Sequence, residues 1–266
     1  MCRAAEVSRS SFYRFRAAQA SLEEECKVRD AVEKVALEWP AYGSRRITME
    51  LQHRGWEINR KRVQRIMREG NLLCLREPTS WLVTTDSKHS LRVFPNLTLD
   101  LEVTAINQLW VADITYIRLR QEFVFLAAIL DAFSRRVIGW HVDRSLEARL
   151  CVTALEMALR RRAIQPGLIH HSDRGVQYCS QEYVDMLLRH AIRGSMSAKG
   201  NPYQNALAER FWRTLKYEQV YREEYRDLDH ARRDISHFIE RVYNQRRLHS
   251  ALGYRSPADF EIRGLE

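Results

Sequence analysis

Three acidic residues lie in surroundings that favour shared chemistry over simple exposure to water. Asp113 lies within the apolar run 110–117, where an unpaired charge is costly to bury. Asp173 follows a short predicted strand, and Glu209 falls one turn into a helix predicted over about 204–221. A shared divalent cation would offset the cost of burial, because hard ions such as Mg²⁺ take oxygen ligands. Two such ions about 3.5–4 Å apart stabilise both the attacking and the leaving oxygen of a phosphodiester.

The sequence around each acid is more specific than the spacing between them. Asp173 and Glu209 have 35 residues between them, which is weak evidence in a chain with 34 acidic residues. The strings are WVADITYI around Asp113, HSDRGVQY around Asp173 and NALAERFWRTLK around Glu209. They resemble the catalytic core of DDE transposases related to retroviral integrases, and above all the OrfB-type protein of bacterial insertion-sequence family three. The resemblance implies a ribonuclease-H-like fold in which Asp113, Asp173 and Glu209 hold the metal ions.

Composition is consistent with a nucleic-acid partner inside a cell. The chain carries 43 Lys and Arg against 34 Asp and Glu, a formal net charge of +9. Its five cysteines are scattered without a CxxC pair, which indicates reduced thiols and neither a disulfide frame nor a zinc knuckle. The longest apolar run, 123–130, is too short to cross a bilayer, and no signal peptide opens the chain. We therefore expect a cytoplasmic protein with no membrane partner, and the bacterial family adds association with the nucleoid.

The first segment, 1–20, has two interpretations. The string VSRSSFYR resembles the end of a helix-turn-helix whose earlier helices would lie upstream of Met1. In the resembled family an upstream reading frame supplies that part, so an upstream helix-turn-helix protein or fused module is an expected partner. The alternative is a frayed basic terminus.

A small all-helical domain is predicted over 21–70. Apolar residues recur at helical spacing over 23–39, 44–54 and 59–69, with Asn59 as the N-cap of the last helix. The last two segments outline a helix-turn-helix. The third helix carries five cations that could contact DNA phosphates: Arg60, Lys61, Arg62, Arg65 and Arg68. The alternative is a solvated basic face.

The segment 71–108 is predicted to be a linker, and a core of mixed α/β class follows over 109–222. β-branched and aromatic residues predict three antiparallel strands over 109–119, 122–131 and 134–143. The elements predicted next are a helix over 147–162, a strand over 167–171, a helix over 180–190, a short strand over 192–196 and the helix bearing Glu209. This order agrees with the ribonuclease-H-like fold that the resemblance implies.

The last segment, 223–266, is predicted to be a helix over 229–244 and a basic tail. The tail YNQRRLHSALGYRSPADF resembles the carboxy-terminal string of the same family, with Leu248 where proline is usual. The residues suggest packing against the core or DNA and nothing more specific.

Several polar residues compete with the three acids or assist them. Asp131 and Asp143 each end a predicted strand beside turn residues, where an exposed aspartate is ordinary. His170 and His171 alternate on one strand, and Mg²⁺ prefers oxygen, so we expect packing or supporting roles for them. The two cations Arg213 and Lys216 lie on the same side of the helix as Glu209, in position to touch DNA phosphates or simply to face water.

These observations predict a DNA transposase catalytic subunit. Two Mg²⁺ ions, with Mn²⁺ able to substitute, would activate water to cleave a strand at an element end and then activate the freed 3′-OH for joining. Element ends and target DNA are the substrates, and joining two ends implies a homo-oligomer. The alternative is a DNA-binding regulator or an inert relic that needs an upstream partner.

Overall fold

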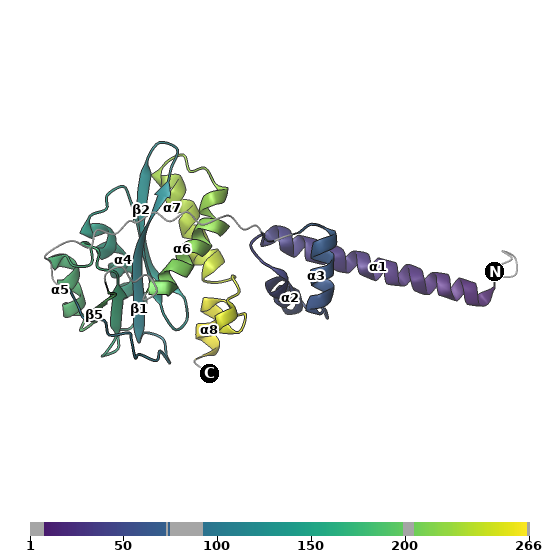
Figure 1. Ribbon diagram of the computed structural model, residues 1–266, viewed down its shortest axis with the longest axis horizontal. Helices are drawn as coiled ribbons and strands as arrows, with labels where there is room; N and C mark the ends of the chain where they lie inside the picture. The colour runs from purple at the N-terminus through teal and green to yellow at the C-terminus, as the bar shows by residue number, and fades with distance from the viewer. Residues whose placement is uncertain (1–7, 73, 75–92, 199–204, 265–266) are drawn as a thin grey trace. The chain divides into compact units, whose positions relative to one another are not determined.

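The computed structural model describes residues 8–72, 74, 93–198 and 205–264. Contacts divide the chain into two compact units, Met1–Glu77 and Pro78–Glu266 (Figure 1). Within the described ranges, no helix combines the length and the apolar character that crossing a membrane requires.

The first unit is built from three helices. They are α1 (Arg9–Glu38), α2 (Ser44–His53) and α3 (Arg60–Glu69). The side chain of Asn59 accepts a hydrogen bond from the backbone N–H of Arg62 at 2.9 Å, so Asn59 is the N-cap of α3. The helices α2 and α3 contact one another and bury Ile47, Leu51, Val63, Ile66 and Met67. The predicted helix pair is confirmed.

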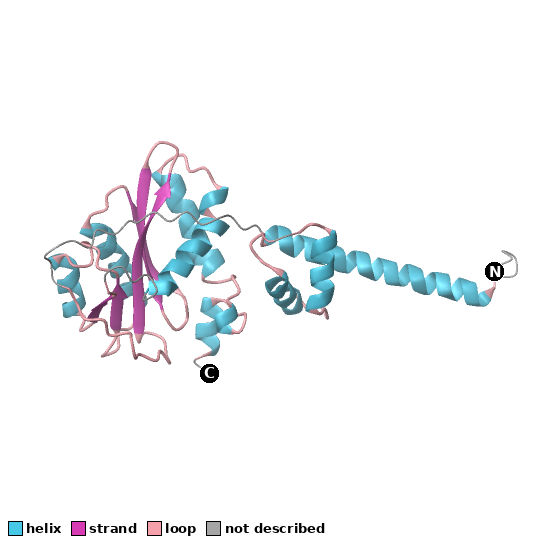
Figure 2. Ribbon diagram, viewed as in Figure 1, coloured by secondary structure: helices cyan, strands magenta, loops and turns pink. Residues whose placement is uncertain are grey.

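A five-stranded mixed sheet forms the centre of the second unit (Figure 2). The strands are β1 (Leu109–Arg118), β2 (Phe123–Asp131), β3 (Val137–Asp143), β4 (Ile169–Ser172) and β5 (Arg193–Met196). Their order is β3-β2-β1-β4-β5. The strands β1, β2 and β3 pair antiparallel, whereas β4 and β5 pair parallel to their neighbours. This sheet confirms the predicted order of elements.

Helices cover both faces of the sheet (Figure 1). Because side chains alternate along a strand, β1 supplies Trp110 and Ala112 to one face and Leu109 and Val111 to the other. The first face packs on α4 (Ala148–Arg161) and α5 (Gln181–Arg189). The second packs on α6 (Ala206–Glu218) and α7 (Leu228–His237). Asp113 has the same parity as Val111 and therefore belongs to the face that α6 covers.

A helix approaches the sheet closely at Gly139 on β3. A methyl group at this position would lie 2.2 Å from the carbonyl oxygen of Ala154 on α4. No heavy atoms pack at that distance, so only glycine lets α4 lie this near the strand.

Three expected boundaries differ from the structure. The helix expected to begin at Glu23 already begins at Arg9, so α1 takes in the described part of the segment that resembles the end of a helix-turn-helix. The strand β3 begins at Val137 because the preceding residues form a turn. The helix α6 ends at Glu218, and Val220–Arg222 is a separate 3-10 turn, η2. Residues 1–7, the linker residues 75–92 and the loop 199–202 lie outside the described residues.

The carboxy-terminal tail packs on the core. After α7 the chain continues as a π-helical segment, η3 (Phe238–Tyr243), a 3-10 turn, η4 (Ser250–Leu252), and α8 (Pro257–Arg263). The Asn244 side chain accepts from the backbone N–H of Val137 and donates to its carbonyl oxygen, both at 2.9 Å, as a neighbouring strand would. The carboxylate of Glu261 accepts hydrogen bonds from Ser134, Arg136 and Arg162.

A buried ion pair joins this tail to α6. The Arg247 guanidinium donates to both carboxylate oxygens of Glu218, at 2.8 and 2.7 Å, and the two side chains are only 6% and 10% exposed. A two-point pair of this kind fixes the relative orientation of its partners. The carboxy-terminal segment therefore holds the end of the helix on which Glu209 lies.

Substitution Arg247→Gln should destabilise the second unit by about 3–5 kcal/mol, because Glu218 would stay buried without its cation. The matched control is Arg263→Gln, since Arg263 pairs with Asp259 at 3.1 Å but is 64% exposed. That change should cost about 0–1 kcal/mol. Urea unfolding of both variants measures the difference. Equal losses would show that the pair with Glu218 contributes no more than a surface contact.

Candidate active site

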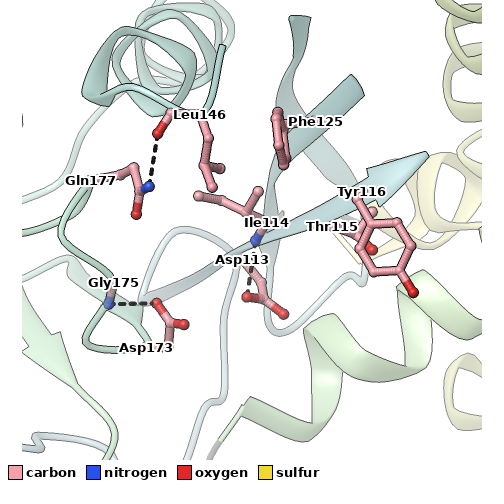
Figure 3. A pocket seen from close by; sticks show the side chains of 9 residues that line it. All are labelled: Asp113, Ile114, Thr115, Tyr116, Phe125, Leu146, Asp173, Gly175 and Gln177. Carbon is pink, nitrogen blue, oxygen red and sulfur yellow. Dashed lines mark hydrogen bonds between the residues drawn. The ribbon is translucent and has the colours of Figure 1, made fainter. Parts of the chain in front are cut away.

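Strand pairing brings two of the predicted acids to one place. The parallel register of β1 and β4 sets Val111 opposite His171, so Asp113 and Asp173 lie two positions further along at the same level. Both line a pocket together with Ile114, Thr115, Tyr116, Phe125, Leu146, Gly175 and Gln177. Figure 3 shows the two carboxylates side by side below Ile114. The pairing of β1 with β4 thus brings Asp113 and Asp173 close together.

The carboxylate of Asp113 is held by two neutral donors. One oxygen accepts from the backbone N–H of Ile114 and the other from the indole N–H of Trp212, each at 2.9 Å. Burial raises the pKa of Asp113 to about 7, and the charge of Asp173 adds to the rise, while the two hydrogen bonds oppose it. Within the described ranges, no cationic side chain lies within 4.0 Å of this carboxylate.

Asp173 is oriented by the turn that follows β4. Its Oδ1 accepts a hydrogen bond from the backbone N–H of Gly175 at 3.0 Å (Figure 3). A Cβ on Gly175 would lie 3.0 Å from that same oxygen. The glycine thus lets the backbone approach close enough to fix the carboxylate in the pocket.

Glu209 lies in the first turn of α6 and does not line the pocket. It is half-buried, and burial raises its pKa while the charge of Arg213 lowers it. Its charge also contributes to the raised pKa of Asp113, so the two groups interact. The carboxylate oxygens of the three acids do not all lie within 4.8 Å of one another. The structure therefore brings two acids together and leaves the third near them.

Trp212 is a functional candidate that was not singled out in the sequence. It is 7% exposed and follows Glu209 by three residues, so it lies one turn further along the same side of α6. Its bond to Asp113 ties that helix to β1, and a second tie runs from Asn205 Nδ2 to the carbonyl oxygen of Ala112 at 3.1 Å. The helical spacing from Glu209 was the signal that could have found it.

The two predicted DNA-contacting cations of α6 have different surroundings. Lys216 is half-buried, with its Nζ 4.4 Å from the centre of the Tyr116 ring. Burial lowers its pKa, and the charge of Asp113 opposes that shift. Arg213 is exposed. Lys216 therefore borders the pocket, while Arg213 faces water near Glu209.

The competing residues have structural partners. Asp131 is fully buried, and its carboxylate caps the turn after β2 by accepting from the backbone N–H groups of Asn107, Phe133 and Ser134. Asp143 accepts from the N–H of Ser145 at 3.2 Å. The ring of His170 bonds to Tyr183, and that of His171 bonds to Ser195, both at 2.9 Å. Burial lowers the pKa of His170 to about 3, so it is neutral.

Two of the five cations on α3 are engaged inside the first unit. Arg62 and Arg65 each reach the carboxylate of Glu25 on α1 at 2.7 Å. The remaining three cations, Arg60, Lys61 and Arg68, are exposed and form no ion pair with a described residue. The predicted basic face of α3 is thus smaller than the sequence suggested.

One further set of potential metal ligands lies on the second unit. Ligand atoms of Glu223, His230 and Asp234 lie within 4.8 Å of one another. However, His230 Nδ1 accepts a hydrogen bond from the backbone N–H of Arg226 at 3.3 Å, which leaves the proton of a neutral ring on Nε2. The Nε2 atom of that ring lies 3.4 Å from a carboxylate oxygen of Asp234 and 3.6 Å from one of Glu223. His230 thus has polar partners both within α7 and in the segment that precedes it.

The residues of the pocket fit a divalent cation. Asp113 and Asp173 offer hard oxygen donors, and their charges repel one another. A bound cation would relieve this repulsion and the cost of burial together. The candidate ligands are Asp113, Asp173 and, from α6, Glu209.

Comparisons with family models and with known proteins show what the chain is similar to. Residues 103–202 and 190–257 match models described as Integrase core domain, and residues 23–78 match an HTH-like domain. The chain is 38% identical over 264 residues to an uncharacterized 31 kDa protein of insertion element IS600 from Shigella sonnei, covering 98% of this chain and 97% of that protein. It is 36% identical over 271 residues to transposase InsF of insertion sequence IS3A from Escherichia coli, covering 100% and 94%. A simian T-cell lymphotropic virus intasome chain matches with a TM-score of 0.49 and 16% identity over 86% of this chain and 74% of that chain.

Substitution Trp212→Phe should weaken Mn²⁺ binding by about 10–100-fold, because it removes a hydrogen bond that orients a ligand while keeping an aromatic ring. The measurement is calorimetric titration of the full chain with Mn²⁺. Trp140→Phe is the matched control, since the Trp140 indole N–H donates to Glu240 at 2.8 Å, away from the pocket. A purely structural role for Trp212 would predict equal Mn²⁺ affinity in the two variants and a lower melting temperature for Trp212→Phe.

Proposed function

The chain belongs to the insertion-sequence transposases that carry an integrase core, and from this premise we propose that Asp113, Asp173 and Glu209 are its catalytic acids. It is thus an enzyme of the DDE transposase and integrase class. The proposal is carried by one observation. Two carboxylates, those of Asp113 and Asp173, converge in one pocket, and burial raises the pKa of Asp113 to about 7.

Two divalent ions, Mg²⁺ or Mn²⁺, would supply Lewis acidity and activate water and then a 3′-OH when bound at these acids. The surrounding residues of the chain hold the carboxylates in position. Trp212 and the backbone N–H of Ile114 hold the Asp113 carboxylate, and Gly175 holds that of Asp173. Lys216 offers a cation at the border of the pocket to the phosphate under attack. Hydrolysis and transesterification both use nucleophiles from the substrates, so no side chain need form a covalent bond with DNA.

The substrates and partners follow from this reaction. The family and the helix-turn-helix-like match indicate DNA binding. We propose that the DNA comprises the element ends and the target, that joining two ends requires a homo-oligomer, and that an upstream helix-turn-helix module adds recognition of the ends. We also propose that the chain is divided into five segments with separate roles. Their limits are 1–20, 21–70, 71–108, 109–222 and 223–266.

Substitutions Asp113→Asn, Asp173→Asn and Glu209→Gln should each abolish cleavage and joining while DNA affinity survives, because phosphate contacts by Lys and Arg dominate binding. The assay follows strand transfer of labelled element ends with Mg²⁺ or Mn²⁺, with and without the upstream module. Asp143→Asn is the matched control, since Asp143 caps a turn outside the pocket. Full strand transfer by any one of the three variants would remove that residue from the site.

Stability offers a test of Asp113 that is independent of activity. Because folding raises its pKa from 3.8 to about 7, its ionisation destabilises the fold increasingly as pH rises through that interval. In EDTA, Asp113→Asn should therefore melt higher than the wild type above pH 7 and lose that advantage near pH 4. At 100 times its dissociation constant, Mg²⁺ should stabilise the wild type by about 2.7 kcal/mol, which is about 5–10 °C, and the variant less. Identical Mg²⁺ shifts would exclude Asp113 as a ligand.

The α3 cations are tested by salt dependence. Neutralising Arg60, Lys61 and Arg68 together should flatten the slope of log K against log salt by about 0.9 for each lost phosphate contact. The paired variant Arg62→Gln with Arg65→Gln should instead lower stability and change the slope less, because these two residues pair with Glu25. An unchanged slope in the triple variant would mean that α3 presents a solvated basic face and no DNA contact.

A further inference from the structure

Three aromatic side chains form a row that leads outward from the pocket. Phe125 on β2 and Tyr116 on β1 are cross-strand partners, and both line the pocket. Phe123 lies two residues before Phe125, on the same face of β2. Its ring meets that of Tyr116 edge to face, with the ring centres 5.7 Å apart. We call Phe125, Tyr116 and Phe123 the aromatic stripe.

The outer end of the aromatic stripe is open to solvent. Phe123 is 52% exposed and Tyr116 is half-buried. Neither belongs to the buried clusters that pack on the two faces of the sheet. A single exposed phenylalanine is ordinary on a protein surface. This one, however, continues a row of rings that begins inside the candidate active site.

Two cations flank the aromatic stripe. Lys216 Nζ lies 4.4 Å from the centre of the Tyr116 ring, and the guanidinium carbon of Arg118 lies 6.0 Å from the centre of the Phe123 ring. Neither cation forms an ion pair with a described residue. The acidic Asp143 of β3 lies opposite Phe125, at the other end of the stripe. A phosphate backbone is therefore attracted toward Arg118 and repelled from β3.

We propose that the aromatic stripe stacks against an unpaired base of the DNA strand that enters the pocket. The inference rests on the transposase function and names the form of DNA that this surface binds. Inside a duplex both faces of a base are covered by its neighbours, so only an unpaired or terminal base offers a face to an aromatic ring. Lys216 and Arg118 contact the phosphates that flank this base.

The stripe lies close to the acids. Tyr116 follows Asp113 by three residues, which is about 10 Å along β1. Figure 3 shows Tyr116 on the opposite side of Asp113 from Asp173. A strand whose phosphate lies between the two carboxylates therefore reaches the aromatic stripe within about three nucleotides, at the duplex rise of about 3.4 Å for each nucleotide.

The test measures binding of the full chain to two DNA molecules in EDTA at one salt concentration. One is a short duplex with a single-stranded tail, and the other carries a tail of abasic nucleotides of equal length. The two tails have the same phosphates, so the difference in affinity isolates base stacking from charge. The wild type should prefer the intact tail by about 5–150-fold, the range for one base stacked on an aromatic side chain.

Substitution Phe123→Leu keeps apolar volume but removes the face of the ring, so it should lose most of this preference, whereas Phe123→Trp should keep or increase it. The loss from Phe123→Leu and the loss from the abasic tail should not add, because they remove the same contact. Leu188→Ala is the matched control. Leu188 is 57% exposed on α5, so the change removes a similarly exposed apolar side chain elsewhere and should leave the preference intact.

Arg118→Gln tests the flanking cation. It should flatten the slope of log K against log salt for the tailed duplex by about 0.7, the value for one phosphate contact to a single strand. An unchanged slope would contradict the contact between Arg118 and a phosphate.

Equal affinity of the wild type for the two tails would overturn the proposal, as would an unchanged preference in Phe123→Leu. Light scattering covers the rival occupant. If Phe123→Leu lowers the mass in solution and leaves the preference unchanged, the aromatic stripe joins copies of this chain and does not bind a base. Strand transfer with Mg²⁺ is scored separately. A preference without strand transfer would count against the catalytic function alone, and strand transfer without a preference would count against the stripe alone.

Discussion

The parallel register between β1 and β4 is the constraint on which the rest of the core depends. It sets Asp113 and Asp173 at one level although they are far apart in the chain. Burial, together with the charge of Asp173, raises the pKa of Asp113 to about 7, so the charged form of Asp113 is unfavourable unless a cation binds. The antiparallel strands β2 and β3, the helices on both faces and the carboxy-terminal segment all stabilise the strand on which this register is built.

Much of this architecture was predictable because the spacing of apolar residues along the sequence indicates which side chains are buried. An abundance of β-branched and aromatic residues predicted β1, β2 and β3, and their order with the later elements indicated the fold. The acids were identified from the sequence around them and not from their spacing. Whether Asp113, Asp173 and Glu209 share a metal remains a prediction, and the structure adds that Glu209 lies outside the lining of the pocket. The continuity of α1 as one helix from Arg9 to Glu38 was missed because the residues before Glu23 lack a regular apolar stripe.

Pairing between distant side chains could not be predicted from one sequence. Nothing in the run of cations on α3 distinguishes Arg62, which pairs with Glu25, from Arg60, which faces water. The basic tail likewise gave no sign that Arg247 would be buried against Glu218. Charge composition predicts a class of partner, whereas the number of cations left for that partner depends on which acids the fold brings into reach.

The contact at Gly139 has a consequence for how copies of an insertion sequence lose their activity by mutation. A single added methyl group there would collide with the backbone of α4, on the face of the sheet opposite the one that carries Asp113. Displacing that helix would disturb the strands whose pairing aligns the acids. One nucleotide change at this codon would thus inactivate the transposase of a copy although its three acidic residues are unchanged. Counting copies by their preserved acids would then overestimate how many can still move.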